Sequence, residues 1–162
     1  MTEGMTEVAF HTGVDDPVGY ACRLLRKAWR SGARVAVYGP PGLLARLDQS
    51  LWSFEPMEFI PHLSLPRDGV SPDVLSRTPI LLMRDRALRP GNSVTVAVGL
   101  GLGEDDALDL QGFKRVIDVV SDDPYDKATA RKRWRAYEQA GAQPQHLAPG
   151  KPARPAADLP GD

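Results

Sequence analysis

The chain has 162 residues, a length that suits one domain and leaves little room for a second. Lys and Arg number 20 against 21 Asp and Glu, which gives a net charge of -1. This balance excludes a protein whose whole surface is a polycation for duplex DNA, although a local basic patch remains compatible with it.

The sequence offers few groups for metal or disulfide chemistry. Cys22 is the single cysteine, so an internal disulfide and a thiolate zinc site are excluded. The three histidines are too scattered to predict a metal cluster. There is no apolar run of about 18 residues and no signal-peptide pattern, so we expect no membrane span and a cytoplasmic location.

Strand and helix patterns alternate along the chain. Short apolar or β-rich runs predict strands at Glu7–His11, Arg34–Tyr38, Glu58–Pro61, Ile80–Met83, Ser93–Val98 and Phe113–Val120. Apolar steps of three and four predict helices from Pro17 to the stop at Gly32, over Leu43–Trp52, and from Asp123-Pro124 to about Ala140, with a loop at Leu65–Pro79. The alternation predicts a three-layer α/β domain over residues 1–142, with a mainly parallel sheet and a Rossmann-like topology.

The composition changes at residue 143. From there to residue 162 the chain is rich in Pro, Ala and charge and has no aromatic residue. Such a segment buries too little surface to offset the entropy of ordering, so we expect residues 143–162 to be a disordered tail.

Two glycine-rich turns invite a nucleotide-binding interpretation. Gly99–Gly103 follows a strand, but Glu104 stands where the dinucleotide motif needs its third glycine, and further acids follow. Gly39–Gly42 lacks the Lys-Ser/Thr pair of a phosphate loop. We expect both to be plain turns, and we predict no catalytic site and no cofactor.

The last helix carries the strongest functional signal. Lys127, Arg131, Trp134 and Arg135 project within about a quarter of its circumference, so three cations flank one indole. A solvated face would explain the charges alone, but an exposed indole among them favours a binding surface. Such a surface suits an acidic peptide with an apolar end, or single-stranded nucleic acid.

A second cluster of aromatic residues and prolines spans residues 51–61. Trp52 and Phe59 lie at the end of a helix and in the loop that follows it. Core packing and a partner interface explain these residues equally well, because aromatic side chains dominate both settings.

Four stretches resemble the chi subunit family of bacterial DNA polymerase III. Residues 28–35 (AWRSGARV) are similar to the family's "WRSGKRV", and residues 46–52 (RLDQSLW) to "LDEALW". Residues 59–62 (FIPH) resemble "FVPH", and residues 131–141 (RKRWRAYEQAG) resemble "RERYKAYRVAG". The four occur in order, from about residue 6 to residue 141. Trp134 stands at the motif's Tyr and Arg135 at its Lys, which keeps an aromatic ring and a cation.

The resemblance implies a non-catalytic adaptor in DNA replication. Members of the family bridge the psi subunit of the clamp loader to the acidic C-terminal tail of single-stranded-DNA-binding protein, and so reach single-stranded DNA indirectly. Carried over to this sequence, the tail-binding residues are Lys127, Arg131, Trp134 and Arg135, with Val120 and Phe113 lining the pocket for the tail's terminal phenylalanine. The psi-binding residues are Trp52, Phe59, Ile60 and Pro61. Direct binding of single-stranded nucleic acid by the basic helix remains the alternative.

Overall fold

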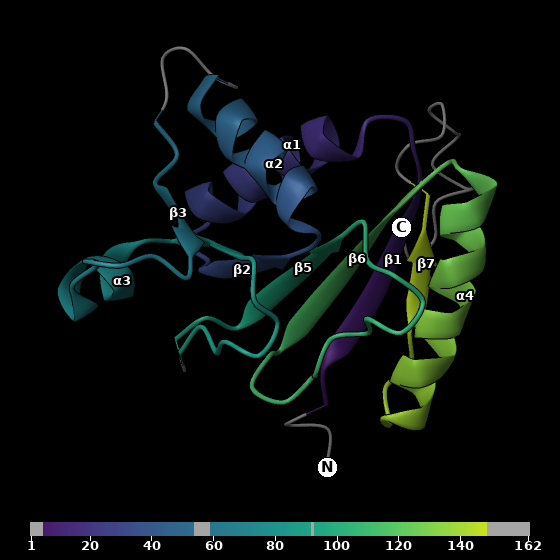
Figure 1. Cartoon of the computed structure of the whole chain (residues 1–162). Coiled ribbons are helices and arrows are strands. Elements are labelled where there is room, and N and C mark those ends of the chain that lie inside the picture. The colour runs from purple at the N-terminus through teal and green to yellow at the C-terminus, as the bar shows by residue number, and fades with distance from the viewer. Residues whose placement is uncertain (1–4, 54–58, 92, 149–162) are drawn as a thin grey trace.

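The computed structural model describes residues 5–53, 59–91 and 93–148. These residues form an open sheet of seven parallel strands in the order β3-β4-β2-β5-β6-β1-β7. Helices α1 and α2 cover one face of the sheet and α4 covers the other (Figure 1). The predicted three-layer α/β class with a parallel sheet is therefore confirmed.

The strands and helices have the following bounds. The strands are β1 (Glu7–Val14), β2 (Val35–Tyr38), β3 (His62–Leu65), β4 (Ile80–Met83), β5 (Val96–Leu100), β6 (Arg115–Ser121) and β7 (Gln145–Leu147). The helices are α1 (Pro17–Arg30), α2 (Pro41–Ser53), α3 (Pro72–Arg77) and α4 (Pro124–Gln139).

Local sequence explains where the two longest helices begin. Asp16 caps α1 by accepting a hydrogen bond from the backbone N–H of Gly19. Asp123 caps α4 in the same way, accepting from the backbone N–H of Tyr125 at 2.8 Å. In both helices proline follows the cap, at a position where a missing N–H costs nothing.

The core has two halves, one on each face of the sheet. In β2, Val35 and Val37 point to the face of the sheet that α1 and α2 cover, while Ala36 and Tyr38 belong to the half of the core on the α4 side. All four are buried, which is why this strand is an unbroken apolar run instead of an alternating one. The apolar stripe of α1 packs on the first half of the core through Ala21, Cys22 and Leu25, among others.

Three expectations about elements were wrong. No strand covers Ile60 and Pro61; β3 begins at His62, while Glu58 lies outside the described residues. The stretch expected to be a loop contains the short helix α3, capped by Ser71.

The third wrong expectation concerns the C-terminal tail. Residues Gln145–Leu147 are not disordered but form β7, paired in parallel with β1. Composition could not reveal this strand, because its stability comes from the open edge of β1. Residues 149–162 lie outside the described residues. No helix in the described part of the chain is both long and apolar enough to cross a bilayer.

Candidate functional site

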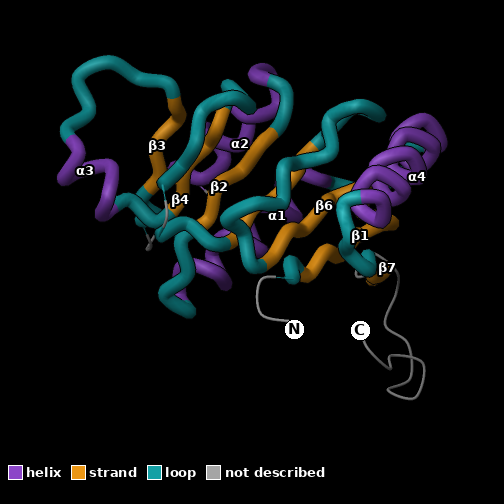
Figure 2. Tube along the Cα trace, turned by 90° about the horizontal axis from the view of Figure 1, so that it is seen from below, coloured by secondary structure: helices purple, strands orange, loops and turns teal. Residues whose placement is uncertain are grey.

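A groove of about 640 Å³ runs between α4 and the sheet edge formed by β1 and β7. Figure 2 shows α4 lying over this end of the sheet, next to β1 and β7. The lining residues come from four elements and their loops: Phe10, Thr12, Gly13, Val120, Asp122, Lys127, Ala130, Arg131, Trp134, Arg135, Glu138 and His146. We call this feature the α4 groove.

The α4 groove brings together the residues expected on the last helix. Lys127, Arg131 and Arg135 are exposed, and all three line the groove. Residues four apart lie on one side of a helix, so the spacing alone aligns these cations along one wall. An anionic ligand in the groove would meet three positive side chains in a row.

Trp134 is half-buried and does not stand free among the charges. Its ring lies 5.1 Å from that of Phe10 on β1, with the two planes tilted by 38°. The indole is thus part of the core edge as well as part of the groove wall. This contact supplies the apolar floor on which a ligand's hydrophobic side chain could lie.

The two strand residues expected in the pocket lie at opposite ends of β6. Val120 is buried at the carboxyl end of β6 and lines the α4 groove. Phe113 precedes β6 and packs edge-on against Tyr38, with 6.3 Å between the ring centroids. It is not among the residues that line the groove. The structure therefore separates Phe113 from the other five predicted residues.

Several lining residues were missed at the level of sequence. Alternation along β1 could have indicated Phe10 and Thr12, because both project toward α4. His146 could not have been found, since it enters the groove only through the pairing of Phe10 with His146 between β1 and β7. The imidazole Nε2 of His146 lies 2.5 Å from the hydroxyl oxygen of Thr12, which links the two strands at the groove floor.

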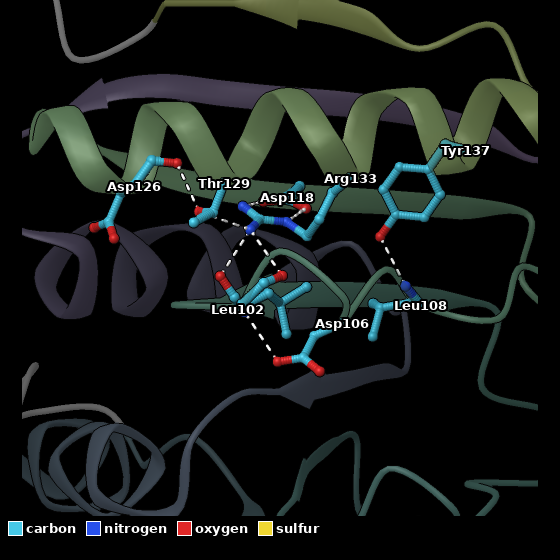
Figure 3. A network of polar contacts seen from close by, with 9 residues as sticks. Leu102, Asp106, Leu108, Asp118, Asp126, Thr129, Arg133 and Tyr137 are labelled. Carbon is cyan, nitrogen blue, oxygen red and sulfur yellow. Dashed lines mark hydrogen bonds and ion pairs between the residues drawn. The ribbon is translucent and has the colours of Figure 1, made fainter.

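A buried ion pair holds α4 in its orientation. Arg133 and Asp118 are 1% and 0% exposed, and the guanidinium donates two hydrogen bonds to the carboxylate, at 2.7 and 2.9 Å. The third guanidinium nitrogen donates to the carbonyls of Leu102 and Gly103 and to the hydroxyl of Thr129 (Figure 3). Burial raises the pKa of Asp118, and the hydrogen bonds from Arg133 oppose that rise.

This ion pair determines which face of α4 is free. Arg133 belongs to the same basic run as Arg131 and Arg135, yet it points into the protein. With that side chain fixed, its two basic neighbours are turned to the groove. On the inward side, the Tyr137 hydroxyl accepts a hydrogen bond from the backbone N–H of Leu108, which ties a second turn of α4 to the same long loop (Figure 3).

The glycine-rich turns are explained by packing. A Cβ on Gly99 would lie 2.4 Å from the Leu102 side chain, and one on Gly39 would lie 2.3 Å from the Leu100 carbonyl oxygen. Within the described ranges, no three His, Cys, Asp or Glu side chains are grouped so as to hold a metal ion. Cys22 is buried, and burial raises the pKa of its thiol to about 11, which leaves it unreactive.

The second aromatic cluster forms a surface patch. Trp52 and Phe59 are 54% and 58% exposed, and their rings lie 5.1 Å apart. Trp52 also packs on the buried imidazole of His62 at 4.7 Å. We call these exposed rings the Trp52–Phe59 patch.

The other residues expected beside this patch behave differently. Ile60 is buried in the core, and Pro61 is partly buried. Beneath the patch, His62 Nδ1 donates to the Ile60 carbonyl oxygen at 2.8 Å, and its Nε2 lies 2.9 Å from an oxygen of Asp48. Ile60 therefore supports the loop from inside while Phe59 faces solvent.

The fold resembles that of domains from two DEAD-box proteins. The C-terminal domain of the DEAD-box protein Dbp5 superposes with a TM-score of 0.61 and 10% identity, covering 93% of this chain and 94% of that domain. The helicase domain 2 of Mss116p, solved with an RNA duplex, gives a TM-score of 0.58 at 10% identity, covering 93% of this chain and 66% of that one. At this identity the likeness concerns the fold alone.

Sequence comparison is more specific. The DNA polymerase III subunit chi of Pseudomonas aeruginosa is 31% identical over 122 residues, which are 75% of this chain and 78% of the relative. A family model described as DNA polymerase III chi subunit, HolC, matches residues 5–145, a range that includes the Trp52–Phe59 patch and every lining residue of the α4 groove except His146. The chain therefore belongs to the DNA polymerase III chi subunit family.

Proposed function

We propose that this chain is a non-catalytic adaptor of the DNA polymerase III holoenzyme. In this proposal the α4 groove binds the acidic C-terminal tail of single-stranded-DNA-binding protein, and the Trp52–Phe59 patch binds the psi subunit of the clamp loader. Family membership supports the assignment to the polymerase. The row of Lys127, Arg131 and Arg135 beside an apolar floor is the observation that carries the first half.

The chemistry of the α4 groove suits an acidic peptide that ends in an apolar residue. Lys127 and Arg135 are eight residues apart on the helix, a rise of about 12 Å, which matches a short stretch of extended peptide. Carboxylates of the ligand pair with the cations along the wall. The apolar side chain of the ligand lies against Phe10, Val120 and Trp134.

The acids of the α4 groove limit where negative charge can lie. Asp122 precedes Lys127, and Glu138 follows Arg135, so both ends of the cationic row are bounded by a carboxylate. A long polyanion that runs past either end meets repulsion, whereas a short acidic segment does not. This arrangement favours a peptide tail over a nucleic acid strand.

The Trp52–Phe59 patch fits a second partner. Two exposed aromatic rings in contact, with their planes tilted by 41°, supply the kind of apolar anchor on which protein interfaces concentrate their binding energy. Neither ring lines the α4 groove, so the two partners do not compete for one site. This separation is what an adaptor between the clamp loader and single-stranded-DNA-binding protein requires.

A peptide titration tests the groove assignment. The full chain is titrated with a fluorescent peptide ending in Asp-Asp-Asp-Ile-Pro-Phe at two salt concentrations, with a labelled dT oligonucleotide in parallel. We expect peptide binding that weakens with salt and requires the terminal phenylalanine. Binding of the oligonucleotide alone would make α4 a nucleic-acid site and overturn the adaptor proposal.

A pair of neighbouring substitutions localises the interaction. Arg131→Ala removes a cation from the groove wall, whereas Lys132→Ala removes one that pairs with Glu104 at 3.0 Å and is absent from the lining. Only the first should weaken peptide binding. Equal loss in both folded variants would mean that net charge, not the groove, attracts the peptide.

A further inference from the structure

The chain leaves β7 at the α4 groove. β7 runs parallel to β1, so beyond Leu147 the chain emerges at the carboxyl edge of the sheet, where β6 ends and α4 begins. His146, one residue earlier, is itself part of the groove lining. Residues 149–162, with the sequence PGKPARPAADLPGD, follow from this point.

We propose that this C-terminal segment binds in the α4 groove of its own chain and competes there with the acidic peptide. The inference rests on the proposed function of the groove and adds a regulatory element to it. Residues 149–162 are the occupant, and the acidic peptide binds in the groove only after it has displaced them.

Proline spacing is the first argument for this occupant. Pro149, Pro152 and Pro155 recur at every third residue, the spacing that lines one edge of a polyproline II helix. Such segments dock on aromatic-lined grooves, and they lose little conformational entropy in doing so. Phe10 and Trp134 give the α4 groove an aromatic floor of this kind.

Charge complementarity is the second argument, because the segment and the groove each carry both positive and negative side chains. Lys151 and Arg154 precede Asp158 and Asp162 in the segment, so it carries two cations and then two acids. The groove lining supplies carboxylates at Asp122 and Glu138. It supplies cations at Lys127, Arg131 and Arg135. Leu159, next to Asp158, supplies an apolar side chain for the floor.

Reach is the third argument. Asp158 lies ten positions after Ala148, enough to span up to about 33 Å, whereas the cationic row of the groove is only about 12 Å long. A short tether of this kind holds its end at a local concentration in the millimolar range. Weak contacts therefore suffice to keep the segment in the groove.

A spin label tests the location of the segment in the full chain. Ala157→Cys provides the attachment site, because Cys22 is buried. The indole N–H signals of Trp29, Trp52 and Trp134 serve as three reporters. We expect the label to broaden Trp134 and not Trp52, and we expect Arg131→Glu to restore the Trp134 signal. Three unbroadened or equally broadened signals would overturn the proposal.

A mixed sample distinguishes the same chain from a second copy. Isotope-labelled chain without the spin label is combined with spin-labelled chain without the isotope. Broadening of Trp134 should then be absent, because the segment and the groove belong to one chain. Broadening that persists in the mixture would assign the contact to another molecule and contradict the proposal.

Competition is measured with the acidic peptide used above. Asp158→Asn with Leu159→Gln weakens the segment, and Asp68→Asn, an exposed acid at the opposite end of the sheet order, serves as a charge-matched control. If the segment occupies the groove three quarters of the time, the double variant binds the peptide about fourfold more tightly than the parent. An unchanged affinity would contradict competition. Peptide binding absent from parent and variant alike would overturn the proposed function, while the spin-label result would still decide the location of the segment.

Discussion

The α4 groove and the Trp52–Phe59 patch differ in shape, charge and support. The groove is a hollow of about 640 Å³ with three cations on its wall, whereas the patch consists of two aromatic rings on the surface. The buried Arg133–Asp118 pair joins α4, which forms one wall of the groove, to β6, whereas the patch rests on His62. The comparison indicates that a charged hollow and an apolar surface patch rest on separate supports in this fold.

The largest effect on stability is expected from removal of one partner of the buried Arg133–Asp118 ion pair. Asp118→Ala leaves the buried Arg133 guanidinium without its counter-ion and should lower the free energy of unfolding by about 3–5 kcal/mol. Urea unfolding monitored by circular dichroism measures this loss. The control is the double variant Asp118→Leu/Arg133→Met, which removes both charges and should recover a large part of the stability. A double variant as unstable as the single one would contradict this account.

A pH-dependent loss of stability of similar size is expected from His11, which lies on the face of β1 that packs against Tyr20 of α1. Burial, with a smaller contribution from the charge of Arg115, lowers the pKa of His11 to about 4. Since the unfolded chain then binds a proton that the folded chain does not, stability should fall as the pH drops below about 6.5 and level off near pH 4, by about 3 kcal/mol in all.

Thermal unfolding at several pH values checks this prediction. The variant His11→Gln should flatten the curve between pH 6.5 and 4. A curve that stays equally steep in the variant would assign the acid sensitivity to another group. The measurement also separates two effects of low pH, because it shows whether weaker peptide binding in the groove is accompanied by unfolding.

Truncation of the two aromatic rings of the patch should weaken psi binding and leave the stability of the fold largely unchanged. Trp52→Ala and Phe59→Ala each remove a largely exposed ring, so we expect psi binding to weaken by about 2 kcal/mol, some thirtyfold, with peptide binding in the groove unchanged. Calorimetry with purified psi and with the acidic peptide measures both. Parallel loss of the two affinities would show that the surfaces are coupled and would contradict their independence.

The groove wall should show a smaller, salt-dependent effect. Reversing one cation with Arg131→Glu is expected to weaken peptide binding by about 1.5–2 kcal/mol at low salt, and by less at high salt. Lys132→Glu is the matched control outside the groove lining. Salt-independent loss would point to a change of fold instead of a lost charge.

The smallest effect is expected from a conservative change at the groove floor. Trp134→Tyr restores the residue of the family motif and keeps an aromatic ring against Phe10. We expect stability and peptide affinity to change by less than about 1 kcal/mol. Trp134→Ala should cost several times more in both, because it removes the ring contact as well as the ligand surface.

Much of the candidate site follows from local rules. The cap at Asp123, the proline after it and the four-residue spacing of Lys127, Arg131 and Arg135 all depend on helix geometry within one segment. These helix features could be predicted because neighbours in sequence determine them. The place of Val120 in the pocket was expected only from the resemblance to the chi subunit family.

Other features depended on contacts between distant segments. Phe113 and Phe10 are both buried aromatic residues, yet only Phe10 faces the groove. Arg133 looks like a surface cation in the basic run, and only the position of Asp118 turns it inward. β7 exists because β1 offers an open edge, and it alone brings His146 to the floor.

The sequence by itself determined the parallel α/β class, the helix with its row of cations, and the aromatic cluster at residues 52–61. Periodicity, capping and turn chemistry are local properties that a single segment carries. Three outcomes needed the tertiary structure: which side chains line the groove, which cation is buried, and that residues 145–147 form a strand. Those outcomes depend on strand register and on a paired buried charge, and both join residues far apart in sequence.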